Sequence, residues 1–380
     1  MNSSISRRSA LQALAVAPFL SGQVRAAEPM ISLFDGRTLA GWSVREGPES
    51  AFYIEDGAIA GSPSAAYPAW LKSDVQFENF DFTGEFFLKG WCDGGFYFSA
   101  PEHGKRSTTG FKVSLFHQLD EKPRRNSAGS IYPSIAPAKV NVKNNGAWNQ
   151  LRVRMDWPSL QVWMNGERIH NLDCENQPEL KYRLRSGYFG LETLTYPLRF
   201  RNLNVQRLPS KQQWESLYES PADLSKWQIT ESNERSPARF LALGDVLRGD
   251  GLGNLTTREK YRDFELQLYV RGVEYHNGGI LFRSQGGDKR YEIQLHDVAE
   301  AHYPTGSLYH YERAKYPDLQ PEAWFFIQLL VKDQWCMVRI NGENVMEYNG
   351  LEQLDPGFIE LQAHQTGRWI EYKHVRVRKL

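Results

Sequence analysis

The stretch Tyr291–His296 alternates apolar residues with Glu292, Gln294 and His296. Residues two apart in a β-strand share a face, so these three side chains are predicted to lie on one side of a strand. A carboxylate, an amide and an imidazole on one face can accept a proton, hold a polar ligand and donate a proton. The pattern therefore indicates a chemically active or ligand-binding face.

Two further stretches are predicted to add to this face. In Gly279–Ser284, the apolar residues Ile280 and Phe282 leave Arg283 on the opposite side, and alternation over 359–364 does the same for Glu360, Gln362 and His364. The predicted polar face contains Arg283, Glu292, Gln294, His296, Gln362 and His364. The alternative is an ordinary solvated face, which antiparallel sheets often have.

The elements that must position these residues occur twice in the chain. Gly-Gly-x-x-Phe segments begin at Gly94 and Gly278, and related closing segments cover 201–208 and 373–380. A repeat of this length predicts two whole domains and not a solenoid of short units. We expect a first domain over 28–208, a linker over 209–216 and a second domain over 217–380.

The two halves differ on the predicted polar face. The first half retains the apolar alternation, but its other face offers mainly Tyr97, Lys112, Ser114 and Glu192. We therefore expect the second domain to contain the site and the first to have a degenerate one.

Both halves are predicted to be all-β, with the strands arranged as an antiparallel sandwich or barrel. Short runs of period two, bounded by Gly, Asn and Pro, recur through each half, and no long stretch has helical periodicity. Asn165-Gly166 and Asn341-Gly342 each separate two such runs. Asn-Gly tolerates the positive φ of a type I′ turn, so both pairs predict tight hairpins.

The charge balance and the cysteines give no sign of a nucleic-acid partner or of a zinc or redox site. Lys plus Arg equals Asp plus Glu at 45 each, which gives no indication of a nucleic-acid partner. Three cysteines without a CxxC pair do not predict a zinc or redox motif.

The N-terminus predicts an export signal. Arg7-Arg8 precedes an apolar run over 10–20, and Val24-Arg25-Ala26 offers small residues for cleavage after Ala26. The apolar run is shorter than the roughly 20 residues that span a bilayer. We expect a twin-arginine-type signal over 1–26, a mature chain without a transmembrane segment, and a periplasmic or extracellular location.

The motif Leu33-Phe-Asp-Gly-Arg-Thr-Leu-Ala-Gly-Trp42 resembles the opening of the 3-keto-disaccharide hydrolase domain family. The Gly-Gly-x-x-Phe-Arg strand, the YEIQLHD strand, TGSLY, the Asn-Gly hairpin and the closing strand follow that family's order. In the second half the opening motif has diverged over 217–227. The resemblance implies two tandem jelly-roll β-sandwiches of the concanavalin-A-like lectin and glucanase type, acting on a carbohydrate.

The resemblance also implies a chemistry. A 3-keto sugar has an acidic hydrogen at C2, and its removal gives an enolate that expels the C1 substituent before water adds. On this hypothesis Glu292 is the base, Arg283 stabilises the enolate, and His364 protonates the leaving oxygen. A divalent metal on His296, Asp297 or His364 is an alternative to Arg283; the cofactor otherwise stays unknown.

Two other functions stay open. One is a retaining glycosidase, since glucanases of this fold carry acids at positions that here are Glu292, Gln294 and Asp297, with an amide in the middle. The other is a non-catalytic carbohydrate-binding protein, in which Asn277, Tyr309 and Trp324 contact the ligand. Asn277, Gln294, His296, Tyr309 and Gln362 are the predicted substrate-binding residues.

Overall fold

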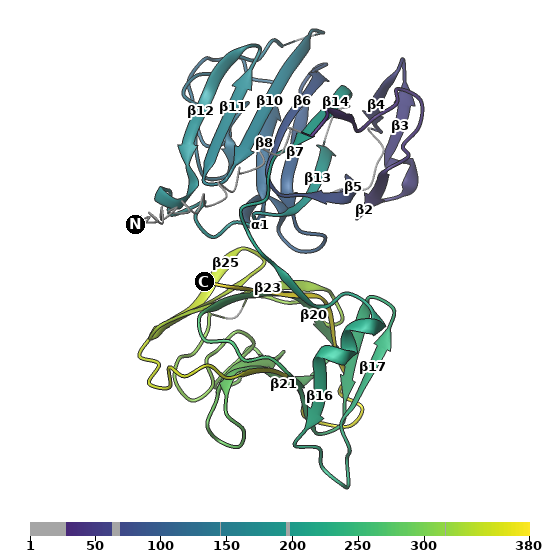
Figure 1. Ribbon diagram of the computed structural model, residues 1–380. Helices are drawn as coiled ribbons and strands as arrows, with labels where there is room; N and C mark the ends of the chain where they lie inside the picture. Colours follow the sequence, from purple (N-terminus) through teal and green to yellow (C-terminus); the bar gives the residue numbers. More distant parts are fainter. Residues whose placement is uncertain (1–27, 63–68, 145, 195–197, 316) are drawn as a thin grey trace, which may run out of the picture.

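The computed structural model describes residues 28–62, 69–144, 146–194, 198–315 and 317–380. The predicted export signal at 1–26 lies outside the described residues and stays a prediction. Each half of the chain forms two antiparallel sheets, and among the described strands none pairs with a strand of the other half. The prediction of two all-β sandwiches is confirmed (Figure 1).

The first domain packs sheet A against sheet B. Sheet A runs in the order β12 (Glu167–Asp173), β11 (Ser159–Met164), β10 (Trp148–Asp156), β6 (Phe80–Phe87), β14 (Arg199–Arg207), β4 (Ala58–Gly61), β3 (Phe52–Glu55), with β1 (Ile31–Ser32) on β14. Sheet B runs in the order β2 (Trp42–Arg45), β5 (Trp70–Phe77), β13 (Gly187–Thr193), β7 (Asp93–Ala100), β8 (Phe111–Phe116), β9 (Ile131–Tyr132).

The second domain packs sheet C against sheet D. Sheet C runs in the order β17 (Arg239–Leu243), β18 (Val246–Asp250), β27 (Ile370–Lys379), β20 (Phe264–Gly272), β23 (Phe325–Lys332), β24 (Trp335–Ile340), β25 (Glu343–Asn349), with β15 (Glu215–Tyr218) on β27. Sheet D runs in the order β16 (Trp227–Thr230), β19 (Gly253–Thr257), β26 (Phe358–Ala363), β21 (Asn277–Ser284), β22 (Tyr291–His296).

Helical structure is confined to short turns in the described chain. These are α1 (Arg106–Thr109) and the 3-10 turns η1 (Glu49–Ala51), η2 (Cys174–Asn176) and η3 (Pro221–Lys226). Within the described ranges, no helix has the length and apolar character needed to cross a bilayer. Strand β15 begins inside the predicted linker 209–216, because Glu215 and Ser216 pair with Val377 and Arg376 of β27.

Alternation of apolar residues fixes which strand face is buried. In sheet D, Ile280, Ile293 and Leu361 point into the core between sheets C and D, and residues one position away point outward. Both Asn-Gly hairpins are confirmed: φ is 51° and 82° at 165–166, and 50° and 81° at 341–342. These turns close the β11–β12 and β24–β25 hairpins with the positive φ that a type I′ turn requires.

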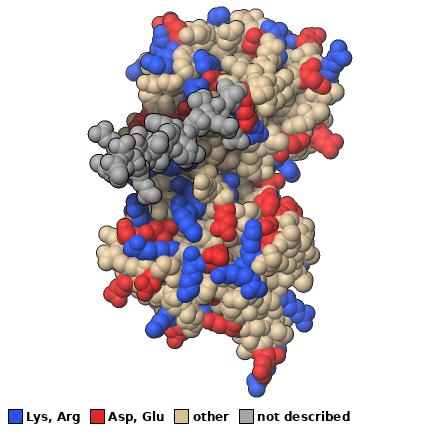
Figure 2. Space-filling view, viewed as in Figure 1, with Lys and Arg blue, Asp and Glu red and all other residues tan. Residues whose placement is uncertain are grey.

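The first domain rests on the outer face of sheet C. Tyr269 and Phe326 of sheet C pack against Leu184 of the first domain, and Lys373 Nζ lies 2.9 Å from Glu102 Oε2. Sheet D therefore lies on the side of the second domain away from the first (Figure 1). Acidic and basic side chains alternate over the visible face of both domains (Figure 2).

Candidate functional site

The outer face of sheet D presents two rows of side chains that run across the strands. In one row, Glu360 of β26 pairs with Leu281 of β21, and Leu281 pairs with Glu292 of β22. In the next row, Gln362 pairs with Gly279, which pairs with Gln294. The strand registers therefore bring Glu292, Gln294 and Gln362 onto one face, as the alternation predicted.

This face is not an ordinary solvated surface. Leu281 is 0% exposed, Glu360 and Asn254 are each 2% exposed, and Thr256 is 3% exposed, although all four point away from the core. Buried polar groups require partners, and Asn254 Nδ2 donates to Glu360 Oε2 over 2.7 Å. The centre of this sheet face is therefore buried, and the alternative of an ordinary solvated face is wrong there.

Glu292 differs from the other acids of this face. Burial raises the pKa of its carboxyl group to about 7, and the nearby positive charge of Arg290 only partly opposes that shift. Among the described residues, no donor lies within hydrogen-bond distance of this carboxyl group. Its Oε1 instead lies over Gly279, where an added Cβ would be 2.5 Å away. A carboxyl group of this kind can exchange a proton near neutral pH.

Sequence reasoning missed three of the charged or polar groups around Glu292, namely Arg290, Glu231 and Asn254. Arg290 Nη1 lies 2.6 Å from Glu231 Oε2 and 3.9 Å from Glu360 Oε2, and Asn254 also donates to Glu231. Burial raises the pKa of Glu360. Alternation places Glu360 on this face with Gln362, as predicted, whereas Glu231 lies outside the strands and Asn254 lies in a strand without clear alternation.

The predicted binding residues lie along the same side of the sheet. Gln294 Nε2 donates to Asn277 Oδ1 over 2.8 Å, and Asn277 pairs with His296. His296 Nδ1 lies 3.0 Å from the carbonyl oxygen of His276. The backbone amide of the exposed Tyr309 donates to the backbone carbonyl of Glu292 over 2.9 Å, so the two residues are neighbours along the edge of the sheet.

The structure corrects the placement of Arg283. The register between β21 and β26 shifts after Leu281, and Arg283 has a φ of 47°, so the bulge turns its side chain away from the polar face. The guanidinium group is fully buried. It donates to the carbonyls of Arg262, Asp333 and Gln353 and to the Asp263 carboxylate. These contacts make Arg283 a structural residue.

His364 does not meet Glu292 either. It is exposed and lies just beyond β26, four positions after Glu360. Four residues of a strand span about 13 Å, so His364 is far along the sheet from the row that contains Glu292. The three predicted catalytic residues therefore do not converge.

The residues of the metal and glycosidase hypotheses do not form a complete site either. Asp297 lies one position beyond the end of β22 and accepts from the Tyr275 amide over 2.9 Å. At the middle position of the glucanase pattern, Gln294 supplies an amide that donates to Asn277 Oδ1, so one of the three acids is absent. The described residues contain no group of three or more His, Cys, Asp or Glu side chains that could hold a metal ion.

Trp324 lies directly before β23 of sheet C and packs beside Tyr269 and Phe326, away from sheet D. Its ring is stacked with His103 of the first domain at 6.1 Å, and Lys373 Nζ lies 4.9 Å from the ring. The structure therefore assigns Trp324 to the contact between the domains and not to the polar face.

The first domain has an equivalent face on sheet B with different chemistry. Lys112 occupies the position of Glu292 and forms an ion pair with Glu192. Tyr97 Oη donates to the same carboxylate over 2.5 Å, and Trp70 is buried alongside at a centroid distance of 5.9 Å from Tyr97. The acid of the first domain is therefore neutralised by its own neighbours, whereas the Glu292 carboxyl group is not.

Fold and sequence together identify the class of protein. The family model described as a 3-keto-α-glucoside-1,2-lyase-like domain matches the chain twice, over 29–206 and 213–378. The chain belongs to this family and is a carbohydrate-active protein built from two copies of its domain.

Solved structures that resemble the chain each cover about one domain. A candidate glycosyl hydrolase from Parabacteroides distasonis is 19% identical, with a TM-score of 0.42, and covers 47% of this chain and 94% of its own. Carbohydrate-binding module CBM66 from Bacillus subtilis is 14% identical, with a TM-score of 0.33, and covers 44% of this chain and 95% of its own. No curated protein is significantly similar to the chain.

Proposed function

We propose that the second domain cleaves 3-keto-glucosides and that Glu292 transfers the proton. The observation that carries this proposal is the Glu292 carboxyl group: its pKa is raised to about 7, and it has no hydrogen-bond donor among the described residues. Perturbed, uncompensated carboxyl groups are concentrated at functional sites. The family described as 3-keto-α-glucoside-1,2-lyase-like supplies the substrate class.

The reaction begins at C2 of the sugar. Ionised Glu292 removes the C2 hydrogen, and the electron pair delocalises onto the 3-keto oxygen as an enolate. Collapse of the enolate breaks the bond between C1 and the departing oxygen, and the proton held by Glu292 passes to that oxygen. Addition of water to the resulting double bond completes a net hydrolysis, whereas its absence leaves an elimination product.

Amide groups on the sheet face are suited to bind the sugar during this step. Gln362 pairs with Gly279, over which the Glu292 carboxyl group lies, and the described residues leave its side-chain amide without a partner. An amide N–H beside the base can donate to the keto oxygen as negative charge develops. Gln362 therefore takes the role that the sequence predicted for Arg283.

The test uses a p-nitrophenyl 3-keto-glucoside and its unoxidised parent. We expect release of p-nitrophenol from the keto compound only, and a rise of kcat/KM with pH up to a plateau above about 7, because the base must be ionised. Glu292→Gln should lower kcat/KM by about 10²- to 10⁴-fold. Glu259→Gln, which changes an exposed glutamate of the same domain, is the matched control and should leave the rate unchanged.

A binding function without catalysis is the second candidate. The separation of Arg283 and His364 from Glu292 favours it, because the predicted set of base, stabiliser and acid is not assembled. Saturable binding of the keto-glucoside in calorimetry without release of p-nitrophenol would establish this alternative. Full activity in Glu292→Gln would refute the role given to Glu292, and release from the unoxidised parent would indicate a conventional glycosidase.

A further inference from the structure

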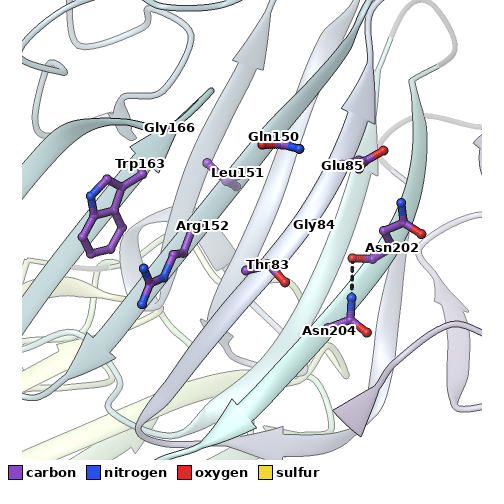
Figure 3. Close-up of a pocket in the computed structure, with 10 residues that line it drawn as sticks. All are labelled: Thr83, Gly84, Glu85, Gln150, Leu151, Arg152, Trp163, Gly166, Asn202 and Asn204. Carbon is purple, nitrogen blue, oxygen red and sulfur yellow. Dashed lines mark hydrogen bonds between the residues drawn. The ribbon is translucent and has the colours of Figure 1, made fainter. Parts of the chain in front are cut away.

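A groove of about 450 Å³ lies on the outer face of sheet A in the first domain (Figure 3). Its volume falls within the range of ligand pockets, about 300–1,000 Å³. Trp163 of β11 pairs with Arg152 of β10, and Arg152 pairs with Thr83 of β6, so the three side chains form one row across the sheet. Gln150 and Glu85 are paired in the neighbouring row.

The charged groups of the groove are already neutralised by neighbours. Arg152 donates twice to Asp81, at 2.8 and 2.6 Å, and Glu85 accepts from Arg201 Nε over 2.8 Å. A ligand therefore finds no uncompensated charge to pair with. This balance favours a neutral ligand over a phosphate, a carboxylate or a cation.

The remaining polar groups of the groove suit a ligand rich in hydroxyl groups. Figure 3 shows the side chains of Thr83, Gln150 and Asn202 on the strands that line it. Within the described residues, none of these three side chains has a hydrogen-bond partner. A hydroxyl group or an amide supplies both a donor and an acceptor, which matches the hydroxyl groups of a sugar.

Trp163 completes the groove with a flat apolar surface. Its ring is partly exposed, and the Arg152 guanidinium lies 4.7 Å from the ring centroid, which holds the ring in place. An aromatic ring beside amides provides apolar contact for the C–H face of a pyranose and polar contact for its edge.

The equivalent face of the second domain shows that the groove residues of the first domain are not there to hold the two domains together. The equivalent face of the second domain has Arg339 in place of Trp163 and Gln328 in place of Arg152. That face is covered, because Arg339 is buried and donates to the Tyr182 carbonyl of the first domain. The same sheet face thus forms the interdomain contact in one copy and an open groove in the other.

We propose that this groove is a second carbohydrate site that binds a neutral gluco-oligosaccharide without cleaving it. The site is separate from the polar face of sheet D, so it does not depend on the chemistry proposed for Glu292. Its role is to hold a saccharide chain on the first domain.

Isothermal titration calorimetry of the full chain tests the proposal, with maltohexaose, cellohexaose and laminarihexaose as probes. We expect at least one of these neutral hexasaccharides to bind. Trp163→Ala should weaken binding about ten-fold or more, and Gln150→Ala about three-fold or more. Trp91→Ala removes an exposed tryptophan of the same domain outside the groove and is the matched control, with affinity unchanged.

Three results would overturn the proposal. One is the absence of binding by all three hexasaccharides at millimolar concentration, and another is binding that Trp163→Ala and Gln150→Ala leave unchanged. The third is stronger binding of an acidic hexagalacturonate than of every neutral probe. Circular dichroism melting of both variants shows whether a loss of affinity is local or reflects unfolding.

Discussion

A carboxyl group that keeps its proton up to about pH 7 behaves differently from a surface glutamate. Burial raises the pKa of Glu292 because the low-polarity surroundings disfavour its charge, and the described structure supplies no hydrogen bond to offset that cost. Glu192 of the first domain shows the contrast, since Lys112 and Tyr97 both contact its carboxylate. Both domains therefore have a glutamate on this sheet face, and the two differ in whether neighbouring side chains contact the carboxyl group.

Arg283 provides a second prediction at the residue scale. Arg283→Met would leave three carbonyl oxygens and the Asp263 carboxylate without their buried donor. We expect the free energy of unfolding to fall by about 3 kcal/mol or more, with the rate per folded molecule unchanged. Urea denaturation and kcat measured on the folded fraction check this expectation.

Arg262→Met is the matched control for Arg283, because Arg262 is exposed and belongs to the same region. It should cost less than about 1 kcal/mol. If Arg283→Met retained its stability but lost activity, the catalytic role predicted from sequence would be restored.

At the scale of the element, β21 provides space for the acid of β22. An added Cβ at Gly279 would have the Glu292 side chain as its three nearest neighbours, the first at 2.5 Å. An equivalent Cβ at Gly278 would instead lie 2.5 Å from the Gln362 carbonyl oxygen and 2.6 Å from Ile370 Cδ1. The two adjacent glycines are therefore required for different reasons.

Gly279→Ala should move the Glu292 carboxyl group while leaving the sheet intact. We expect stability to change by less than about 1 kcal/mol, because the contacted side chain is flexible, and kcat/KM to fall about ten-fold or more because the base is misplaced. Kinetics and thermal melts of the same preparation measure both quantities.

Gly278→Ala supplies the contrast to Gly279→Ala. Its Cβ meets backbone and core atoms, so it should mainly destabilise the fold. Equal activity of Gly279→Ala and the wild type would show that the position of Glu292 over this glycine does not matter.

At the scale of the whole molecule, a charged cluster joins the two domains. Glu102 of the first domain lies 2.9 Å from Lys373 Nζ and 3.5 Å from His374 Nε2. Glu219 lies 2.7 Å from His374 Nδ1. Burial opposes the charge of His374, but hydrogen bonds to Glu102 and Glu219 outweigh it and raise the pKa of this histidine to about 9.

The raised pKa of His374 gives a definite sign to the pH dependence. Because the folded state binds the proton more tightly than the unfolded chain, whose reference pKa is 6.5, the stabilisation is complete below pH 6.5. It is lost as pH rises through about 9. We expect the free energy of unfolding to fall by about 1–3 kcal/mol between these pH values, measured by urea denaturation.

His374→Asn should remove most of this pH dependence, and asparagine tolerates the φ of 50° at this position. His302→Asn is the control, because His302 is an exposed histidine of the same domain. If the free energy of unfolding of His374→Asn still fell by the same amount between pH 6.5 and about 9, another group would be responsible for the titration at the interface.

The sequence by itself determined the duplicated all-β fold, both Asn-Gly hairpins and the shared face of Glu292, Gln294 and Gln362. Period-two alternation fixes the face of a strand wherever its register is regular, and Asn-Gly fixes a turn through its own backbone preference. Only the tertiary structure decided that the Arg283 side chain is buried away from the polar face, because the bulge at this residue depends on the pairing of β21 with β26.

The tertiary structure also decided which polar groups are compensated. Burial of Glu360, the approach of Arg290 and Glu231, and the closure of one sheet face by the neighbouring domain all depend on residues distant in the sequence. The charge state of Glu292 depends on those distant groups as well, because desolvation arises from the whole surroundings of a side chain. Local patterns therefore predicted where the side chains point, and long-range packing determined what each of them can do.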